Sequence, residues 1–282
     1  MAIKVYSDGA PFHGKNLANI LGATFITDIH TVSSNDTLII VGIYSPLMKD
    51  FEVGVRRAKK VICHWIGTDI WQAMNGDHFS KCLRSSKVVH LTEDVRLQHE
   101  LKTALGLESI ILSDVPQALF EYTPLPKKFA IGVYMYNTRL DFYRNNLMID
   151  VANKFPEIDF YFFGEEVEKG IKIENMEWLG FVPMNKLIPK INGILRFPIH
   201  DGLPFGPIEM MTAGRWTIQE IVMPFMYSCT PEIGIICKMI EEIIEKTDKG
   251  YFDSKRWKEC GTWYRKRYAI ERYKDDMEKY LQ

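Results

Sequence analysis

The sequence lacks the features that mark membrane-spanning and disulfide-stabilised proteins. No run of about eighteen apolar residues occurs along the chain, so we expect no transmembrane segment. The five cysteines are scattered and form no CxxC pair, which predicts buried thiols in a reducing compartment and argues against a disulfide framework or a zinc site. The N-terminal residues lead directly into a strand pattern without a signal-peptide profile. Together these absences predict a cytoplasmic protein.

A large charge of one sign is missing too. The net charge is −1, so no global attraction draws the chain to nucleic acid, and we expect no nucleic-acid partner. A nicotinamide-binding G-x-G-x-x-G fingerprint is absent as well, because the first predicted strand is followed by SDGAPFHG. The sequence therefore argues against a nicotinamide oxidoreductase of the doubly wound fold.

The 282 residues do contain enough apolar material for a sizeable core, with 46% hydrophobic and 12% aromatic residues. Short β-rich runs alternate with helical segments in both halves, which predicts an α/β fold of two Rossmann-like domains facing across a cleft. The alternation stops at EYTPLPKKF (121–129), which we interpret as an interdomain linker. We predict an N-terminal domain over 1–122, a second domain over 129–260 and a charged helix over 261–282.

Two acids bracket a loop in the segment HDGLPFGPIEMMTAG (200–214). Asp201 follows a predicted strand, Glu209 lies beyond a Gly/Pro-rich loop, and a helix is predicted to begin near Ile208. In open α/β sheets ligands bind beyond the carboxyl ends of the strands, and a helix N-terminus attracts anions. Carboxylates beside such an anion site accept hydrogen bonds from hydroxyl groups, so the combination suits a sugar nucleotide. Alternatively, Asp201 is a turn residue or helix cap and Glu209 a first-turn acid that complements the helix dipole.

Two arginines occupy a corresponding position at the start of the second domain. Arg139 and Arg144, in YNTRLDFYRNN, follow a predicted strand and are expected at the same carboxyl edge as Asp201. Arginine binds diphosphate bidentately and stays charged at any working pH. The alternative is that both are ordinary surface groups; their shared edge with Asp201 favours a site.

The segment from Ile131 to Ile218 resembles the nucleotide-binding domain of retaining GT-B glycosyltransferases, the "group 1" or family 4-like type. DGLPFGPIEMMTAG aligns without a gap with the family's E-G-L-P-N-V-L-L-E-A-M-A-x-G, with Asp201 in place of the first glutamate. TRLDFYRN resembles the family's G-R-L-x-x-x-K-G, while FYFFGEE and NMEWLGFVP resemble its strand-Gly and N-V-x-F-L-G-x-V segments. The resemblance implies the GT-B fold, with a C-terminal helix that crosses back onto the first domain.

The resemblance also implies a role for each matching residue. Arg139 and Arg144 would hold the donor diphosphate and stabilise charge on the leaving nucleotide. Asp201 would accept hydrogen bonds from the transferred sugar, and Glu209 from the ribose. The backbone N–H groups expected to approach sugar and phosphate are those of Gly202 and Leu203. Similar enzymes transfer sugar with retention of configuration and use neither a metal nor another cofactor.

Departures from the family pattern lie inside these motifs. Aspartate at Asp201 shortens the reach by one methylene, which affects sugar preference or binding strength, while arginine at Arg144 keeps the charge of the family lysine. Thr138 and Asn145 replace both glycines of the basic motif, so we expect a differently shaped loop there. Phe205 stands where many relatives have a small or amide residue, and nothing in the sequence explains it.

The first domain contributes weaker matches. CHWIGTDIW resembles the His-then-G-[ST]-D segment of some relatives, which implies that His64, Thr68 and Asp69 face the cleft, with Asp69 near the reacting centre. The alternative for His64 is a buried core histidine. The remaining acceptor-side candidates are Gly9 and Gly14, for which an ordinary β–α turn is the alternative, together with His13 and His200.

The sequence therefore predicts a metal-independent, retaining glycosyltransferase, specifically a hexosyltransferase, with a nucleotide-diphosphate sugar as co-substrate. The acceptor, whether a glycan, a lipid-linked sugar or a protein, is undetermined. The basic run VRRAKK (55–60) predicts weak peripheral contact with anionic lipid, with a solvated helix face as the alternative. Two other functions stay open: a GT-B-type sugar-nucleotide epimerase, and a degenerate nucleotide-sugar binding protein without turnover.

Overall fold

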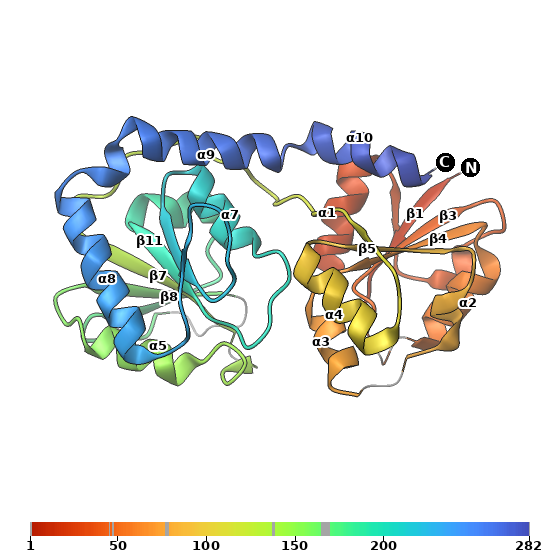
Figure 1. The fold of residues 1–282 in the computed structure, drawn as a ribbon, viewed down its shortest axis with the longest axis horizontal. Helices are drawn as coiled ribbons and strands as arrows, with labels where there is room; N and C mark the ends of the chain where they lie inside the picture. Colours follow the sequence, from red (N-terminus) through yellow and green to blue (C-terminus); the bar gives the residue numbers. More distant parts are fainter. Residues whose placement is uncertain are drawn as a thin grey trace. The chain divides into compact units, whose positions relative to one another are not determined.

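The chain folds into two compact α/β units (Figure 1). The computed structural model describes residues 2–281 except 45, 47, 77–78, 137–138 and 165–169. Unit 1 consists of Met1–Gln117, His200–Leu203 and Tyr268–Gln282, and unit 2 of Ala118–Ile199 and Pro204–Arg267. The predicted α/β class with two parallel-sheet domains is confirmed.

Unit 1 is built on a parallel six-stranded sheet with the order β2-β1-β3-β4-β5-β6. Every residue of β3, TLIIV, is buried, as expected for a parallel strand covered by helices on both faces. The elements of unit 1 are β1 (Ile3–Tyr6), α1 (Pro11–Leu21), β2 (Thr24–Ile26), β3 (Thr37–Val41), α2 (Met48–Arg57), β4 (Lys60–Trp65), α3 (Thr68–Met74), β5 (Val88–Thr92), α4 (Val95–Leu105), β6 (Ile110–Ile111) and α10 (Ile270–Leu281).

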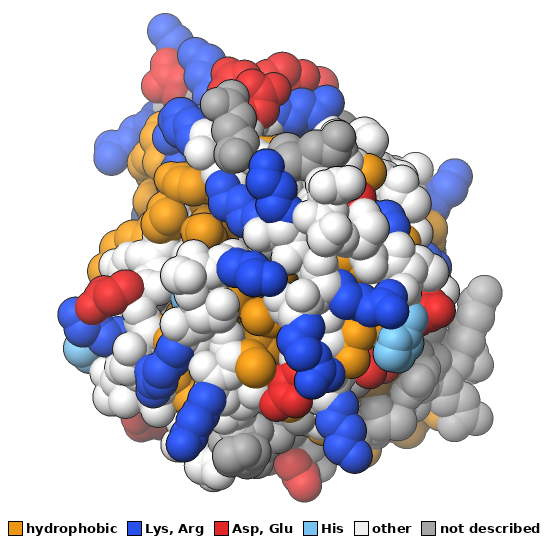
Figure 2. All heavy atoms as spheres, turned by 90° about the vertical axis from the view of Figure 1, so that its right-hand side faces the viewer, with side chains coloured by type: hydrophobic (Ala, Val, Ile, Leu, Met, Phe, Trp, Pro, Cys, Tyr) orange, Lys and Arg blue, Asp and Glu red, His pale blue; other side chains and the backbone are white. Residues whose placement is uncertain are grey.

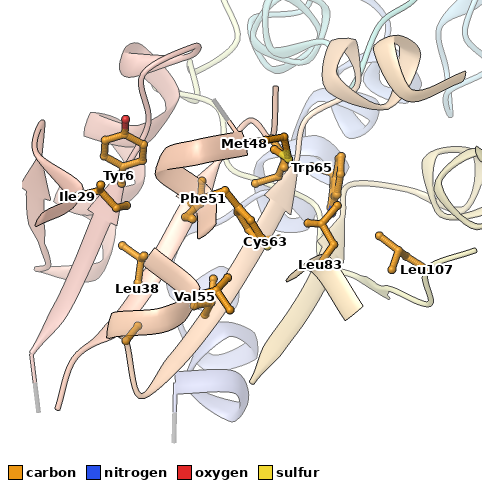
Figure 3. Packing of buried hydrophobic residues seen from close by; sticks show 14 of the residues in the cluster. Tyr6, Ile29, Leu38, Met48, Phe51, Val55, Cys63, Trp65, Leu83 and Leu107 are labelled. Carbon is orange, nitrogen blue, oxygen red and sulfur yellow. The ribbon is translucent and has the colours of Figure 1, made fainter. Parts of the chain in front are cut away.

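Separate apolar clusters cover the two faces of this sheet. On one face Phe51 and Val55 of α2 pack towards Leu38 and Cys63 of the sheet (Figure 3). On the other face α1 and α10 lie side by side (Figure 1), and Met277 of α10 joins the buried cluster there. The last helix therefore belongs to unit 1, as the resemblance implied.

Unit 2 has a seven-stranded sheet with the order β13-β12-β11-β7-β8-β10-β9, which is parallel except for the β9–β10 pair. Its own apolar cluster includes Phe163, Ile194 and Met210. The elements of unit 2 are β7 (Ala130–Tyr134), α5 (Asn145–Asn153), β8 (Asp159–Phe163), β9 (Lys172–Ile173), β10 (Met176–Gly180), α6 (Met184–Leu187), β11 (Gly193–Arg196), α7 (Phe205–Thr212), β12 (Trp216–Gln219), β13 (Tyr227–Ser228), α8 (Ile233–Asp248) and α9 (Lys255–Arg267).

Each sheet has a topological switch point, where the strand order reverses beside its first strand. In unit 1 this point lies between β1 and β3, and in unit 2 between β7 and β11. The connections that leave the carboxyl ends of two such strands diverge, which opens a crevice for ligands. In unit 2 these connections are the segments that carry the predicted arginines and Asp201.

Three predicted boundaries differ from the structure. The segment 121–129, interpreted as an interdomain linker, belongs to unit 2, where the Arg215 guanidinium donates hydrogen bonds to the carbonyls of Thr123 and Pro124 at 2.6 and 3.0 Å. The predicted terminal helix is two helices, and the chain passes from unit 2 to unit 1 at Tyr268 rather than at residue 261. Helix α7 begins at Phe205, earlier than the predicted start near Ile208.

The cysteines are all free in the described part of the chain, as expected. Cys63 and Cys260 are buried, and burial raises the pKa of both thiols. The other three are only partly buried, so the expectation of uniformly buried thiols holds for two of the five.

Candidate functional site

The chain segments that follow β7 and β11 are joined at the switch point of unit 2. The backbone N–H of Ile199 donates to the carbonyl of Phe142 at 2.8 Å. Nη1 of Arg144 lies 3.3 Å from the carbonyl oxygens of both Phe197 and Pro198, which directly follow β11. Arg144 is thus held at the carboxyl edge of the sheet, against the connection that leads from β11 to Asp201.

The charge of Arg144 already has a partner. Nη1 also donates to Oε2 of Glu220 at 2.8 Å, with side-chain exposures of 24% and 45%. Glu220 directly follows β12, so it comes from the strand next to β11. An anion that binds Arg144 competes with this carboxylate. The backbone of Arg144 is left-handed, with φ of 50°, and the residue is the N-cap of α5, so a strained turn aims its side chain.

Arg139 lies differently. Its side chain is exposed and its guanidinium sits 5.9 Å from the ring centroid of Phe142. No carboxylate of the described residues pairs with it, so this cation is available to an anion. Thr138, expected to reshape the loop before it, lies outside the described residues.

Helix α7 starts at the carboxyl edge without a side-chain cap. Its N-cap is Pro204, which makes no side-chain hydrogen bond, so the positive end of the helix is not neutralised by an acid. Glu209 lies inside this helix, not in its first turn, and is only 7% exposed. Burial raises the pKa of Glu209 to about 7, opposed by the Ala118 N–H, which donates to Oε1 at 3.4 Å.

The first residues of the acidic motif belong to unit 1. Asp201 is partly buried, and its carbonyl accepts a hydrogen bond from Nη2 of Arg96 at 2.5 Å. The N–H of Leu203 donates to Oε2 of Glu93, a carboxyl that is 1% exposed. This corrects the expectation that the Leu203 N–H approaches sugar and phosphate, because a buried side chain already accepts it.

Two motif glycines meet within unit 1. A Cβ built on Gly67 lies 2.5 Å from the backbone nitrogen of Gly202, and one built on Gly202 lies 2.0 Å from the carbonyl oxygen of Ile66. Gly67 also has φ of 109°, which side chains rarely adopt. The IGTD and DGLP segments, which lie far apart in the sequence, therefore pack backbone against backbone.

Asp69 does not face open space as expected. It is fully buried, and its carboxylate accepts hydrogen bonds from four backbone N–H groups. Burial raises the pKa of Asp69 to about 6, and these hydrogen bonds oppose the rise. The geometry is that of a side chain that shapes the loops after β3 and β4. The four donors are Ile43, Ile66, Gly67 and Ile70.

The other acceptor-side candidates are mostly buried. His64 is 0% exposed and lies on the α1 side of the sheet, like its strand neighbour Ile62. Burial lowers its pKa, partly opposed by Asp114. Thr68, at the start of α3, is partly exposed.

The two loop glycines differ from each other. Gly14 is a packing glycine, since a Cβ there lies 2.6 Å from Cβ of Ser7. Gly9 is exposed beside the Tyr44 ring, with 2.2 Å from its Cβ position to the nearest ring carbon. His200 is bound by its Nε2 to Glu100 at 2.9 Å. Gly14 and His200 therefore have structural contacts that the sequence did not show.

Glu93 and Glu220 are the residues that sequence reasoning missed. Each directly follows a strand, β5 and β12 respectively, at the carboxyl edge of its sheet. That position after a strand is the same signal that indicates Asp201, so the sequence pattern also indicates these two carboxylates.

Two kinds of feature are absent from the described residues. No helix there combines the length and apolarity needed to cross a membrane. No group of three or more His, Cys, Asp or Glu side chains is arranged to hold a metal ion.

Comparison with known proteins places the fold. No protein-family model and no curated protein sequence matches the chain. Among solved structures, Anabaena HepE in complex with UDP and glucose matches with a TM-score of 0.70 at 12% identity, covering 100% of this chain and 99% of HepE. The lipopolysaccharide outer core galactosyltransferase WaaB gives 0.57 at 12% identity, covering 88% of this chain and 91% of WaaB. S. aureus TarM gives 0.64 at 14% identity over 88% of this chain.

The chain spans about half the length of some of these proteins, 54% in the case of TarM. The matched structures are GT-B glycosyltransferases, so the GT-B fold expected from the motif resemblance is confirmed. At these identities the likeness concerns the fold.

Proposed function

We propose that the protein transfers a sugar from a nucleotide-diphosphate donor to an acceptor hydroxyl. The observation that carries this proposal is the convergence, at the switch point of unit 2, of Arg144 and the connection after β11. The fold shared with glycosyltransferases supports it.

The donor diphosphate lies, in this proposal, between Arg144, Arg139 and the uncapped N-terminus of α7. Both arginines come from the connection after β7, and α7 follows the connection after β11. Negative charge develops on the diphosphate as the sugar–phosphate bond breaks. The two arginines and the helix N-terminus therefore stabilise the transition state more than the ground state. Because the two arginines and the helix dipole stabilise the negative charge of the diphosphate, we propose transfer without a metal ion.

The carboxylates of the motif provide hydroxyl recognition. Asp201 accepts hydrogen bonds from the transferred sugar, and Glu209 from the ribose. HepE is in complex with UDP and glucose, and the pneumococcal transferase GtfA with UDP and GlcNAc, so uridine diphosphate sugars are the first donors to test. Retention of configuration follows from the motif resemblance and is part of the proposal.

Binding of a nucleotide sugar without turnover is the second candidate. Two features favour it: Glu220 pairs with Arg144, and the Leu203 N–H is committed to Glu93. Both reduce the groups available to the leaving diphosphate. A sugar-nucleotide epimerase of the same fold would also use the donor site, but its product would be an isomeric sugar without any transfer.

A basic face on unit 1 supports a peripheral contact with anionic lipid, as expected for a lipid-linked acceptor at the cytoplasmic surface. Figure 2 shows Lys and Arg side chains spread over one face of the molecule, with hydrophobic side chains between them. Within the described part of the chain, seven exposed cations around α2, β4 and β5 form no ion pair with a carboxylate, so they contribute a positive field. The exposed cations around α2, β4 and β5 are Lys49, Arg56, Arg57, Lys59, Lys81, Arg84 and Lys87.

The donor site is tested by calorimetric titration of UDP, GDP and ADP in the presence of EDTA. We expect one nucleotide to bind the wild type and Arg144→Ala to weaken it at least about tenfold, because a charge-assisted contact is lost. Arg256→Ala, an exposed arginine of α9, is the matched control and should bind like the wild type. If no nucleotide binds the wild type, the donor-site assignment is wrong.

A further inference from the structure

A group of exposed apolar side chains in unit 2 lies outside the residues assigned to the donor. The connection from β12 to β13 reads IVMPFM (221–226), and in it Val222 and Phe225 are 84% and 48% exposed. On α9, Trp263 is 38% exposed, and its ring packs edge-to-face on that of Phe225 with centroids 5.7 Å apart. All three residues belong to unit 2, and we refer to them as the apolar patch.

The loop that carries this patch is firmly held. Nε2 of Gln219 and Oγ of Ser228 both donate to the carbonyl of Ile221, at 2.9 and 3.0 Å. The hydroxyl of Tyr264, a fully buried residue of α9, donates to the carbonyl of Pro224 at 2.5 Å. The backbone of the loop is therefore fixed at its start and in its middle, so its apolar side chains are held in the solvent by built contacts.

The tip of the loop is a strained turn. The N–H of Met226 donates to the carbonyl of Met223 at 3.3 Å, and Phe225, the third residue of this turn, has φ of 64°. Type II turns favour proline at the second position, where Pro224 stands, and glycine or asparagine at the third, because φ is positive there. A bulky residue with positive φ is a genuine outlier, and such strain clusters at functional sites. The turn thus accepts strain in order to present an aromatic ring at the surface.

The face of α9 that carries Trp263 is basic. Arg256 lies seven residues before Trp263 and Lys266 three residues after it, so helical periodicity places both on the same face. The helix has six basic residues and one acid, Glu259, whose carboxylate is 4.0 Å from Nζ of Lys255. In the part of the chain that the structure describes, neither Arg256 nor Lys266 forms an ion pair with a carboxylate. The apolar patch is therefore flanked by positive charge.

This combination of side chains selects the partner. Exposed tryptophan, phenylalanine and valine beside lysine and arginine are the composition of surfaces that enter the headgroup region of an anionic membrane. A second copy of the same surface fits less well, because it would bring two basic helix faces together and like charges repel.

We propose that the apolar patch of unit 2 inserts into the interfacial region of an anionic lipid bilayer. Val222, Phe225 and Trp263 enter the boundary between headgroups and acyl chains, and Arg256 and Lys266 contact the lipid phosphates. The basic face of unit 1 supplies electrostatic attraction, and this patch adds the apolar anchor that those cations lack. The inference does not depend on sugar transfer, because lipid binding is measured without a donor.

The test is co-sedimentation of the full chain with vesicles of phosphatidylcholine alone and of phosphatidylcholine mixed with phosphatidylglycerol. Phe225→Asn removes the ring and places at the turn a residue that accepts positive φ, so this variant should be at least as stable as the wild type in urea unfolding. Val222→Asp and Lys266→Glu change the loop and the basic face separately. The matched controls are Phe181→Asn, an exposed phenylalanine elsewhere in unit 2, and Lys238→Glu, an exposed lysine of α8.

We expect the wild type to bind the vesicles that contain phosphatidylglycerol. Phe225→Asn and Val222→Asp should each lower the binding constant about tenfold or more, since apolar area is no longer buried. Lys266→Glu should lower it about tenfold, and high salt should weaken binding of the wild type. Both controls should bind like the wild type.

Three results would overturn the inference. Unchanged binding in Phe225→Asn and Val222→Asp would assign the lipid contact to the basic face of unit 1 alone. A wild type that binds neither kind of vesicle would leave no lipid contact at all. A wild-type dimer in light scattering that Val222→Asp converts to a monomer would show that a second copy covers the patch. None of these results bears on donor turnover, so failure here and failure of the proposed function are distinguishable.

Discussion

Arg144 donates a 2.8 Å hydrogen bond to Glu220 at the carboxyl edge of the unit 2 sheet. The two residues come from connections that follow different strands, β7 and β12. Glu220 holds the Arg144 side chain in place when no anion is bound. A diphosphate that binds Arg144 must therefore displace this carboxylate.

The first prediction concerns this competition. Glu220→Gln should strengthen binding of the nucleoside diphosphate about three- to tenfold, because the diphosphate no longer competes with a carboxylate for Arg144. The effect is modest since both side chains are partly exposed and screened by solvent. Titration at low and high salt checks it, and the gain should shrink at high salt. Weaker binding in Glu220→Gln would show that Glu220 itself contacts the nucleotide.

The second prediction concerns the buried acid of the motif. The pKa of Glu209 is about 7 in the folded protein against an ordinary value of 4.5, so the folded state holds its proton to higher pH than the unfolded state. This contribution to stability is therefore complete below about pH 4.5 and is lost as pH rises through about 7. Glu209→Gln removes the loss and should stabilise unit 2 by about 2–3 kcal/mol at pH 8.

Urea unfolding followed by tryptophan fluorescence at pH 5 and pH 8 measures this difference. Glu232→Gln, an exposed acid of the same unit, serves as the control. A variant that is no more stable than the wild type at pH 8 would contradict the buried position of Glu209.

The third prediction concerns Asp69. Asp69→Asn keeps the size of the side chain but turns an amide donor towards backbone N–H groups, so the free energy of unfolding should fall by about 2–3 kcal/mol. Asp8→Asn, an exposed aspartate of unit 1, should leave it unchanged. Unchanged stability together with lost turnover in Asp69→Asn would instead support a direct catalytic role for this residue.

The fourth prediction concerns the segment before β7. Arg215 is fully buried, and its guanidinium donates hydrogen bonds to five oxygen atoms, including the carbonyls of Thr123 and Pro124. Burial lowers its pKa to about 10, so the charge is retained at neutral pH. Lysine cannot reproduce the planar set of guanidinium donors, so Arg215→Lys should lower the free energy of unfolding by about 3 kcal/mol. Faster amide exchange at Thr123 in the variant checks it; unchanged exchange there would mean that the segment is held by other contacts.

The sequence predicts the layout of the unit 2 site because strand polarity determines it. Arg144 and the start of the connection after β11 each follow an apolar run that is too short for a buried helix, and the carboxyl ends of parallel strands share one edge. The position of these two segments directly after their strands therefore indicates a shared edge before any contact is known. The strand order, with β7 beside β11, could not be derived this way, since it depends on pairing between distant segments.

Roles that depend on tertiary contacts are the ones the sequence does not show. An aspartate after Gly-Thr has the same local pattern whether it is open to solvent or, like Asp69, enclosed by backbone N–H groups. The same is true of Leu203, whose N–H is expected to be free from the motif alone but donates to Glu93, a residue more than a hundred positions away.

Donor turnover is the measurement that tests the central claim most directly. Purified protein in EDTA is incubated with UDP-glucose, UDP-GlcNAc and the corresponding GDP- and ADP-sugars, and released nucleoside diphosphate is quantified while the sugar anomer is followed by proton NMR. The account predicts release from one donor with the anomeric configuration retained, and a loss of about a hundredfold in Arg144→Ala. Binding of a nucleotide without release from any donor would contradict the account and assign the chain to nucleotide-sugar binding alone.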